Sequence, residues 1–257
     1  MLSSKEYWKK ISKPAQTTHE EREILDSFIS GYGFREMFED GTMIVAGGAP
    51  RNWYQNRNCN DIDIFFESPR LEERLLKVPD FDLVESGLMK EVAKKTKAKT
   101  KIQKIKAYKD YYLSKDVPEK MAAAVDEVLL DRTMTKKKYV GVGKKGGLSF
   151  INCVLQTNYK GIDFQLISLN GNELEKDNIG SVKEFVVKTF DFEICKVIYN
   201  PVLKVLELAG ESATDFENET LTISTSNLLQ YQRIYTLARR AEKIQGYYPD
   251  HKIVIKP

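Results

Sequence analysis

The stretch Val45–Phe66 reads V-A-G-G-A-P-R-N-W-Y-Q-N-R-N-C-N-D-I-D-I-F-F, and it decides the fold that we expect. The apolar run just before the glycine pair predicts one strand, and the run that ends at Phe66 predicts a second. In the second run Asp61 and Asp63 alternate with isoleucines. Residues two apart on a strand point to the same face. The sequence therefore predicts two carboxylates on one face and buried isoleucines on the other.

Two neighbouring carboxylates repel each other, and a shared divalent cation is the usual way to hold them together. Mg²⁺ binds one or two carboxylates together with phosphate oxygens. Gly47 and Gly48 allow a backbone to approach a ligand closely, and the start of the helix that follows suits an anion. A phosphate cradle and a metal clamp within twenty or so residues indicate a nucleoside triphosphate.

These residues resemble the motif of the DNA polymerase beta-like nucleotidyltransferases, a glycine pair followed by Asp-x-Asp. The version here is similar to the head domain of tRNA nucleotidyltransferases and bacterial poly(A) polymerases, which read G-G-x-x-R-D and then D-x-D. Asn52 departs from this pattern, because the family has Asp there. The matching residues are Gly47, Gly48, Arg51, Asp61 and Asp63.

A second carboxylate-bearing strand is expected further along the chain. The apolar runs 148–155 and 161–169, separated by Gln156–Lys160, predict a β-hairpin. Asp163 alternates with apolar residues in the second run, so it faces away from the apolar side. The resemblance implies a third carboxylate on a neighbouring strand, where it binds metal beside the attacking 3′-hydroxyl, and Asp163 is the candidate. The alternative is an exposed Asp on a half-buried strand.

Two later segments carry weaker likenesses to the same family. Residues 190–200, F-D-F-E-I-C-K-V-I-Y-N, resemble its R-R-D-F-T-I-N-A-L-A-Y-N segment, with Cys195 in place of the inner Asn. The resemblance implies a nucleotide contact for Asp191, which could instead cap a helix. Residues 233–247 resemble the basic helix after the head domain, which implies nucleotide contacts for Arg239 or Arg240. Solvated side chains are the alternative.

The charge is unevenly distributed. Residues 90–145 contain 17 Lys and Arg against 7 Asp and Glu, a net charge of +10, whereas the whole chain has a net charge of +3. Lysines interspersed with tyrosines suit phosphates and bases, which predicts RNA as a partner. The alternative is a solvated helical hairpin over one edge of the core.

Composition excludes several classes of protein. The apolar runs are too short to span a membrane, and the first residues lack the apolar core of a signal peptide. The three cysteines are far apart, which is typical of reduced thiols in a cytoplasmic protein. Only two histidines occur, so a Ser-His-Asp triad or a histidine-rich metal site is not expected.

Capping signals predict several helices. Capping boxes occur at Thr18/Glu21 and Ser181/Glu184, and Ser68-Pro69 predicts a helix that ends before Pro79. Another helix is expected from Pro118. Near the C-terminus we expect a short strand at Leu221–Ile223 and a helix through Ile244, stopped by Gly246 and Pro249.

We therefore expect an α/β protein with a small mixed sheet of the nucleotidyltransferase type. The head domain is expected at residues 1–200, with a basic helical insertion at about 85–145, and a small helical region at 201–257. The hypothesis is a two-metal enzyme, using Mg²⁺ or Mn²⁺, that transfers NMP from an NTP to a hydroxyl on RNA, a tRNA 3′-end being one candidate. The alternatives are a toxin-like enzyme that modifies proteins or small molecules, and a degenerate nucleotide- or nucleic-acid-binding protein. Divergent members of this kind occur in bacteriophages as well as bacteria.

Overall fold

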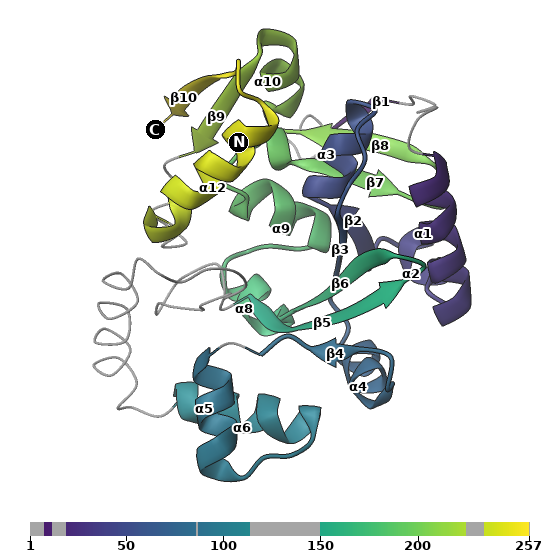
Figure 1. Cartoon of the computed structure of the whole chain (residues 1–257), viewed down its shortest axis with the longest axis vertical. Coiled ribbons are helices and arrows are strands. Elements are labelled where there is room, and N and C mark those ends of the chain that lie inside the picture. Colours follow the sequence, from purple (N-terminus) through teal and green to yellow (C-terminus); the bar gives the residue numbers. More distant parts are fainter. Residues whose placement is uncertain (1–7, 12–18, 86, 114–149, 225–233, 257) are drawn as a thin grey trace.

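The computed structural model describes residues 8–11, 19–85, 87–113, 150–224 and 234–256 (Figure 1). Its strands are β1 (Trp8–Ile11), β2 (Met43–Ala46), β3 (Asp61–Phe66), β4 (Asp82–Leu83), β5 (Ile151–Tyr159), β6 (Ile162–Leu169), β7 (Val197–Asn200), β8 (Val205–Ala209), β9 (Thr220–Ser224) and β10 (Lys252–Lys256). Its helices are α1 (His19–Tyr32), α2 (Arg35–Glu39), α3 (Gly48–Tyr54), α4 (Pro69–Lys77), α5 (Gly87–Thr96), α6 (Lys101–Leu113), α8 (Gly171–Lys176), α9 (Val182–Thr189), η2 (Glu193–Cys195, a 3₁₀ turn), α10 (Ser212–Asn218) and α12 (Ile234–Tyr247).

The architecture is a mixed sheet covered by helices. Within the described residues eight strands form one sheet in the order β1-β8-β7-β2-β3-β6-β5-β4, and β10 pairs with β9 in a small parallel sheet. The β3–β6 pair is parallel, and the other pairs of the large sheet are antiparallel. The predicted fold class, a mixed α/β sheet, is confirmed.

The two faces of the large sheet bury different helices. One face packs against α1 to α4 through a core that contains Phe28, Trp53 and the isoleucines of β3. The opposite face carries Phe65 and packs against α8 and α9. The predicted alternation of side chains along β3 is therefore confirmed, because Ile62 and Ile64 are fully buried on one face of the strand.

The predicted helix starts are confirmed where the structure describes them. Ser68 caps α4 by accepting a hydrogen bond from the Leu71 N–H, and Ser181 caps α9 by accepting from the Glu184 N–H. The predicted capping partner Thr18 and the helix expected from Pro118 lie outside the described residues.

Two element boundaries were predicted wrongly. Strand β5 extends to Tyr159, so the loop expected at 156–160 is a tight turn at Lys160 and Gly161, whose φ angles are 50° and 87°. Positive φ at both positions is typical of a type I′ hairpin turn, whose twist matches the strands. Helix α12 continues through Gly246 to Tyr247, because a single helical glycine weakens a helix without ending it.

The region after residue 200 contains more strands than predicted: the strand expected at Leu221–Ile223 is present as β9, but β8 and β10 were not expected. Strand β8 pairs with β7 inside the large sheet, and β9 and β10 form the small sheet. A separate apolar cluster includes Phe192, Leu221, Ile223, Ile244 and Tyr248. The division into regions at residue 200 stays a prediction, but β8 belongs with the large sheet.

The basic segment begins with two helices at one end of the molecule, α5 and α6, beside α4 and β4 (Figure 1). Lys101 donates to the carbonyl of Val78, and Lys104 forms an ion pair with Glu85 at 2.7 Å. These two lysines fasten α6 to the body. The remainder of the predicted insertion lies outside the described residues. None of the helices in the described ranges is both long enough and apolar enough to cross a bilayer.

Glu21 holds the two halves of the central motif together. Its carboxylate accepts hydrogen bonds from Trp53 Nε1 of α3 at 2.7 Å and from the Cys59 N–H at 3.0 Å, just before β3. Cys59 Sγ also donates to it at 3.3 Å. Burial, followed by the nearby charge of Glu21, raises the pKa of the Cys59 thiol. Helix α1 therefore fixes both ends of the loop between α3 and β3.

We expect Glu21→Gln to lower the free energy of unfolding by roughly 1–3 kcal/mol, because hydrogen bonds to a carboxylate are stronger than those to a neutral amide. Urea denaturation monitored by Trp53 fluorescence would measure the change. Glu20→Gln, an exposed neighbour on the same helix, is the matched control. Equal denaturation midpoints for the two variants would contradict this role for Glu21.

Candidate active site

The strand register brings the three predicted carboxylates together near the N-terminal ends of the parallel strands β3 and β6. Asp61 of β3 lies directly beside Asp163 of β6, and Asp63 lies beside Gln165. Side chains paired in this way share a face of the sheet. It is the face that carries Phe65 and packs against α9. The predicted adjacency of the two carboxylate-bearing strands is confirmed.

Asp63 is the most perturbed of these groups. Its Oδ1 atom is buried and has no hydrogen-bond partner among the described residues. Burial, followed by repulsion from Asp61, raises the pKa of Asp63 to about 7, and the positive charge of Lys243 on α12 opposes the rise. The charged form of Asp63 is therefore stabilised by too few hydrogen bonds and positive charges to offset its burial.

Asp163 and Asp61 each accept a hydrogen bond from a neutral amide side chain. Asn158 donates to Asp163 Oδ1 at 2.8 Å, and Gln165 Nε2 lies 3.5 Å from Asp61 Oδ2. The described part of the chain contains no cluster of three His, Cys, Asp or Glu side chains with the geometry of a metal site. Asp61 and Asp63 therefore form a pair on β3. Asp163 lies beside Asp61 on β6 and is held by its hydrogen bond from Asn158.

Gly47 lies against this pair at the end of β2. Its φ of 87° is one that L side chains rarely adopt, and an added Cβ would lie 3.8 Å from Asp63 Oδ2. Its N–H donates to the carbonyl of Val197 at 3.2 Å. The glycine therefore lets the chain turn beside the carboxylate, while its own N–H is already used. Gly48 is the first residue of α3.

Arg51 is buried instead of facing open solvent. Its guanidinium donates to Asn52 Oδ1, at 3.1 Å from Nη2, and to Cys195 Sγ at 3.4 Å. Its Cζ lies 5.1 Å from the ring centroid of Tyr247 and 5.6 Å from that of Tyr248. Asn52 in turn donates to the carbonyl of Asn58 at 2.9 Å. Arg51 thus joins α3 to the end of α12, and the Asn that departs from the family pattern is its partner.

The remaining predicted nucleotide contacts lie at the junction with α12. Asp191 is buried and forms an ion pair with Arg240. The pair ties α12 to the segment before η2, so Asp191 acts neither as a cap nor as an isolated charge. Arg239 lies on α12, and its side chain is outside the described structure.

Two site residues were not identified from the sequence. Gln165 follows Asp163 by two positions on the same strand, so the two-residue period places it on the same face. Lys243 lies on α12, within the segment that resembles the basic helix after the head domain. Its electrostatic influence on both Asp63 and Cys195 requires α12 to lie over the site. No local sequence pattern predicts that placement.

A model of the Gabija anti-defense 2 family protein matches residues 19–219. No curated protein matches the chain. Among solved structures, a Thermotoga maritima CCA-adding enzyme complexed with tRNA is 14% identical, with a TM-score of 0.46, over 98% of this chain and 43% of that one. A CCA-adding enzyme with ATP is 14% identical, with a TM-score of 0.48, over 96% and 44%. The chain spans less than half the length of these proteins, and such distant likeness does not establish a shared activity.

We expect the stability gain from Asp63→Asn to grow with pH in the presence of a chelator. The folded protein keeps a proton on Asp63 that the unfolded chain loses above about pH 4, so the parent loses stability as pH rises towards about 7. Asn cannot ionise and escapes this loss. The variant should therefore gain roughly 1–4 kcal/mol relative to the parent between about pH 4 and pH 8.

Urea denaturation at each pH measures this difference. Asp82→Asn, at an exposed position on β4, is the control and should track the parent. A difference between Asp63→Asn and the parent that stays constant with pH would show that burial does not suppress ionisation of Asp63.

Proposed function

The chain belongs to the Gabija anti-defense 2 family, and we propose that it is a metal-dependent nucleotidyltransferase that acts against Gabija defence. The observation that carries the proposal is the site on the parallel strand pair. Asp61 and Asp63 share a face of β3, beside Asp163 in register on β6 and with Gly47 against Asp63. Few activities other than metal-assisted phosphoryl chemistry call for such a group of carboxylates beside a glycine turn.

The residues fit a divalent cation at the Asp61–Asp63 pair. The buried Asp63 oxygen without a hydrogen-bond partner among the described residues is a hard ligand of the kind that Mg²⁺ or Mn²⁺ binds. Such an ion, when bound, supplies positive charge that offsets the carboxylates and the triphosphate. Asp163 would join the set only by exchanging its hydrogen bond from Asn158. The pair is thus the core of the proposed metal site.

The proposed reaction is transfer of a nucleotidyl group. An acceptor hydroxyl oxygen attacks the α-phosphorus of an NTP, the new O–P bond forms, and the bond to pyrophosphate breaks. The hydroxyl proton passes to Asp163 or to water. Gly47 and Gly48 let the triphosphate approach the backbone, and Lys243 adds positive charge from α12. Catalysis then consists mainly of positioning and charge neutralisation.

Arg51, Asp191 and Arg240 have a different role in this proposal from the one that the resemblance implied. Arg51 is occupied by Asn52, Cys195 and two tyrosine rings, and Arg240 is paired with Asp191. We assign them to holding α12 over the site. A nucleotide contact by Arg239 remains part of the proposal.

A binding protein without transferase activity is the second candidate. The observation that favours it is the burial of Arg51, which leaves the nucleotide without the contact that this residue provides in the family the motif resembles. Such a protein would bind NTP with metal and release it unchanged.

RNA is the proposed acceptor, bound through the basic hairpin. Six lysines of α5, α6 and their connection are exposed: Lys90, Lys94, Lys95, Lys97, Lys99 and Lys106. Lys101 and Lys104 instead anchor α6. Helices α5 and α6, which carry these lysines, lie at the end of the molecule opposite α10 and β9 (Figure 1). Exposed lysines suit a phosphate backbone.

We expect Asp61→Asn and Asp63→Asn each to reduce transfer of label from α-labelled NTP by at least about a hundredfold, because each removes charge that the transition state needs. The assay contains each NTP in turn, Mg²⁺ or Mn²⁺, and a mixture of tRNA and total RNA. Asp82→Asn is the control and should transfer like the parent.

Label in RNA identifies the acceptor and the base. Label on protein would support the toxin-like alternative, and metal-dependent NTP binding without any transfer would support the binding protein. Full transfer by both Asp variants would rule out the proposed active site.

We expect the combined change of Lys90, Lys94, Lys99 and Lys106 to Gln to weaken RNA binding and to reduce the slope of log K against log salt by roughly 3, if each lysine contacts one phosphate of a single strand. Filter binding at several salt concentrations measures this slope. The control changes four exposed lysines elsewhere, Lys77, Lys176, Lys204 and Lys252. An equal effect of the two sets would show that the hairpin is not a specific RNA surface.

A further inference from the structure

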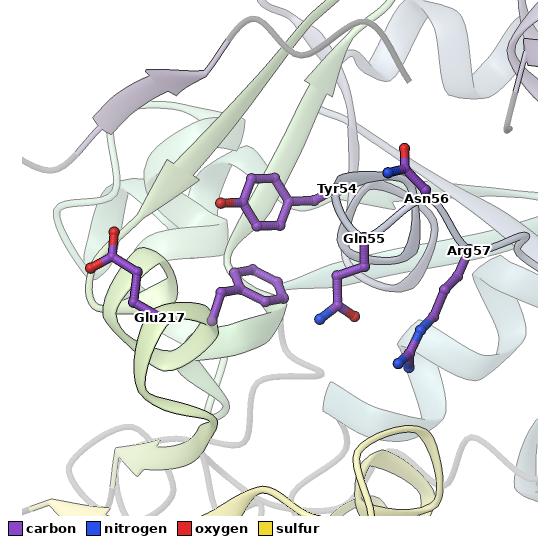
Figure 2. Close-up of a pocket in the computed structure, with 6 residues that line it drawn as sticks. Tyr54, Gln55, Asn56, Arg57 and Glu217 are labelled. Atoms are coloured by element: carbon purple, nitrogen blue, oxygen red, sulfur yellow. The ribbon is translucent and has the colours of Figure 1, made fainter. Parts of the chain in front are cut away.

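A pocket lies at the C-terminal end of α3, whereas the carboxylates lie near its N-terminal end. Its volume is about 430 Å³, within the range of small-molecule sites. It is lined by Tyr54, Gln55, Asn56, Arg57, Phe216 and Glu217 (Figure 2). None of the carboxylates of β3 and β6 lines it. The pocket therefore belongs to a different part of the molecule from the proposed active site.

One wall of the pocket is aromatic. The rings of Tyr54, at the end of α3, and Phe216, on α10, lie 4.5 Å apart between centroids and are tilted by 43°. Both side chains are half-buried, so part of this apolar surface faces solvent. Aromatic surfaces of this kind stack planar groups such as nucleobases.

A positive group faces the pocket from the other side. Figure 2 places Gln55 between Tyr54 and Arg57, with Glu217 on the side away from Arg57. One Arg57 nitrogen, Nη1, donates to the carbonyl of Tyr247 at 2.6 Å, and the guanidinium lies 5.3 Å from the ring centroid of Tyr248. These contacts fix the guanidinium at the rim. Arginine in a fixed position suits phosphate oxygens.

Gln55 supplies an amide between the aromatic wall and Arg57 (Figure 2). Its Oε1 atom is buried and has no hydrogen-bond partner in the described part of the chain. Its Nε2 group lies on the side of Tyr54 in Figure 2, so it is the part of the amide that can donate to an acceptor on a planar ligand held by the wall. Glu217 adds a carboxylate to the lining. Burial, followed by this carboxylate, raises the pKa of Tyr54, which indicates that Glu217 lies within electrostatic reach of that ring.

We propose that this pocket binds a nucleotide, with its base on the Tyr54–Phe216 wall, a hydrogen bond from Gln55 Nε2 to an acceptor on the base, and its phosphate on Arg57. The ligand is either a free mononucleotide or one nucleotide of an RNA strand. The site needs no metal, and it goes beyond the proposed transferase because none of the pocket residues takes part in transfer. Since α3 is seven residues long, the pocket and the carboxylates are separated by a helix of only about 10 Å, so one RNA strand can reach both.

The test measures binding to the full chain carrying Asp61→Asn and Asp63→Asn, in the presence of EDTA. These conditions remove the metal-dependent site. Calorimetry with AMP, CMP, GMP and UMP, and fluorescence anisotropy with a short single-stranded RNA, provide the two readouts. We expect Gln55→Leu and Arg57→Ala each to weaken binding by about tenfold or more. Arg70→Ala, at an exposed arginine on α4, is the matched control and should have no effect.

Using both Gln55→Leu and Arg57→Ala distinguishes a loss of ligand contacts from a loss of folding. Arg57→Ala also removes the hydrogen bond to the carbonyl of Tyr247. The Gln55 side chain makes no hydrogen bond within the described residues, so Gln55→Leu tests the pocket even if α12 loosens. Binding of mononucleotides would identify a free nucleotide, and binding of RNA alone would identify a strand; both support the proposal. Absence of binding in EDTA, or binding unaffected by both variants, overturns it.

The outcomes separate this site from the proposed function. Metal-independent binding that depends on Gln55, in a protein that shows no transfer, would remove the transferase and leave the pocket. Transfer by the parent chain without metal-independent binding would remove the pocket and leave the transferase.

Discussion

The pleat of strand β3 is the constraint on which the molecule depends. Its isoleucines must be buried against α1 and α3, and the same alternation forces Asp61 and Asp63 together on the opposite face. A shift of the strand by one residue would turn both carboxylates into the core around Phe28 and Trp53 and the isoleucines out of it. The register is therefore fixed by the hydrophobic core, and the chemistry of the site follows from that register.

The surroundings of Asp63 keep the pair in place without neutralising it. Gly47 approaches closely because it has no side chain, and the buried Asp63 oxygen has no donor among the described residues. Around this point the protein uses its polar contacts for support: Glu21 fixes the loop before β3, Arg51 joins α3 to α12, and Asp191 pairs with Arg240. Arg51, Arg240 and Asp191, for which the family resemblance implied ligand contacts, here contact the elements around α12.

Local patterns predicted those features whose causes are local. The alternation of Asp61 and Asp63 and the serine caps of α4 and α9 followed from periodicity and capping chemistry, whereas the strand of Asp163 was expected beside them only because the resemblance implied it. Contacts between distant segments did not. Nothing near Glu21 in sequence indicates Trp53 and Cys59 as its partners, and nothing near Arg51 indicates burial by Tyr247 and Tyr248. The strand expected at Leu221–Ile223 is β9, but its pairing with β10 was missed for the same reason, since the two strands of a parallel pair lie far apart in the chain.

The parallel pairing of β3 with β6 has a consequence for the order of events during folding. Asp61 and its register partner Asp163 are about a hundred positions apart, and the basic segment lies between them. Contacts of such long sequence separation form slowly, because a large loop must close before they stabilise anything. On the ribosome, the antiparallel strands β2 and β3 can pair early, whereas the carboxylate face stays incomplete until β6 has been synthesised. The carboxylate face therefore forms later than the pairing of β2 with β3, so part of the core precedes the proposed active site during synthesis.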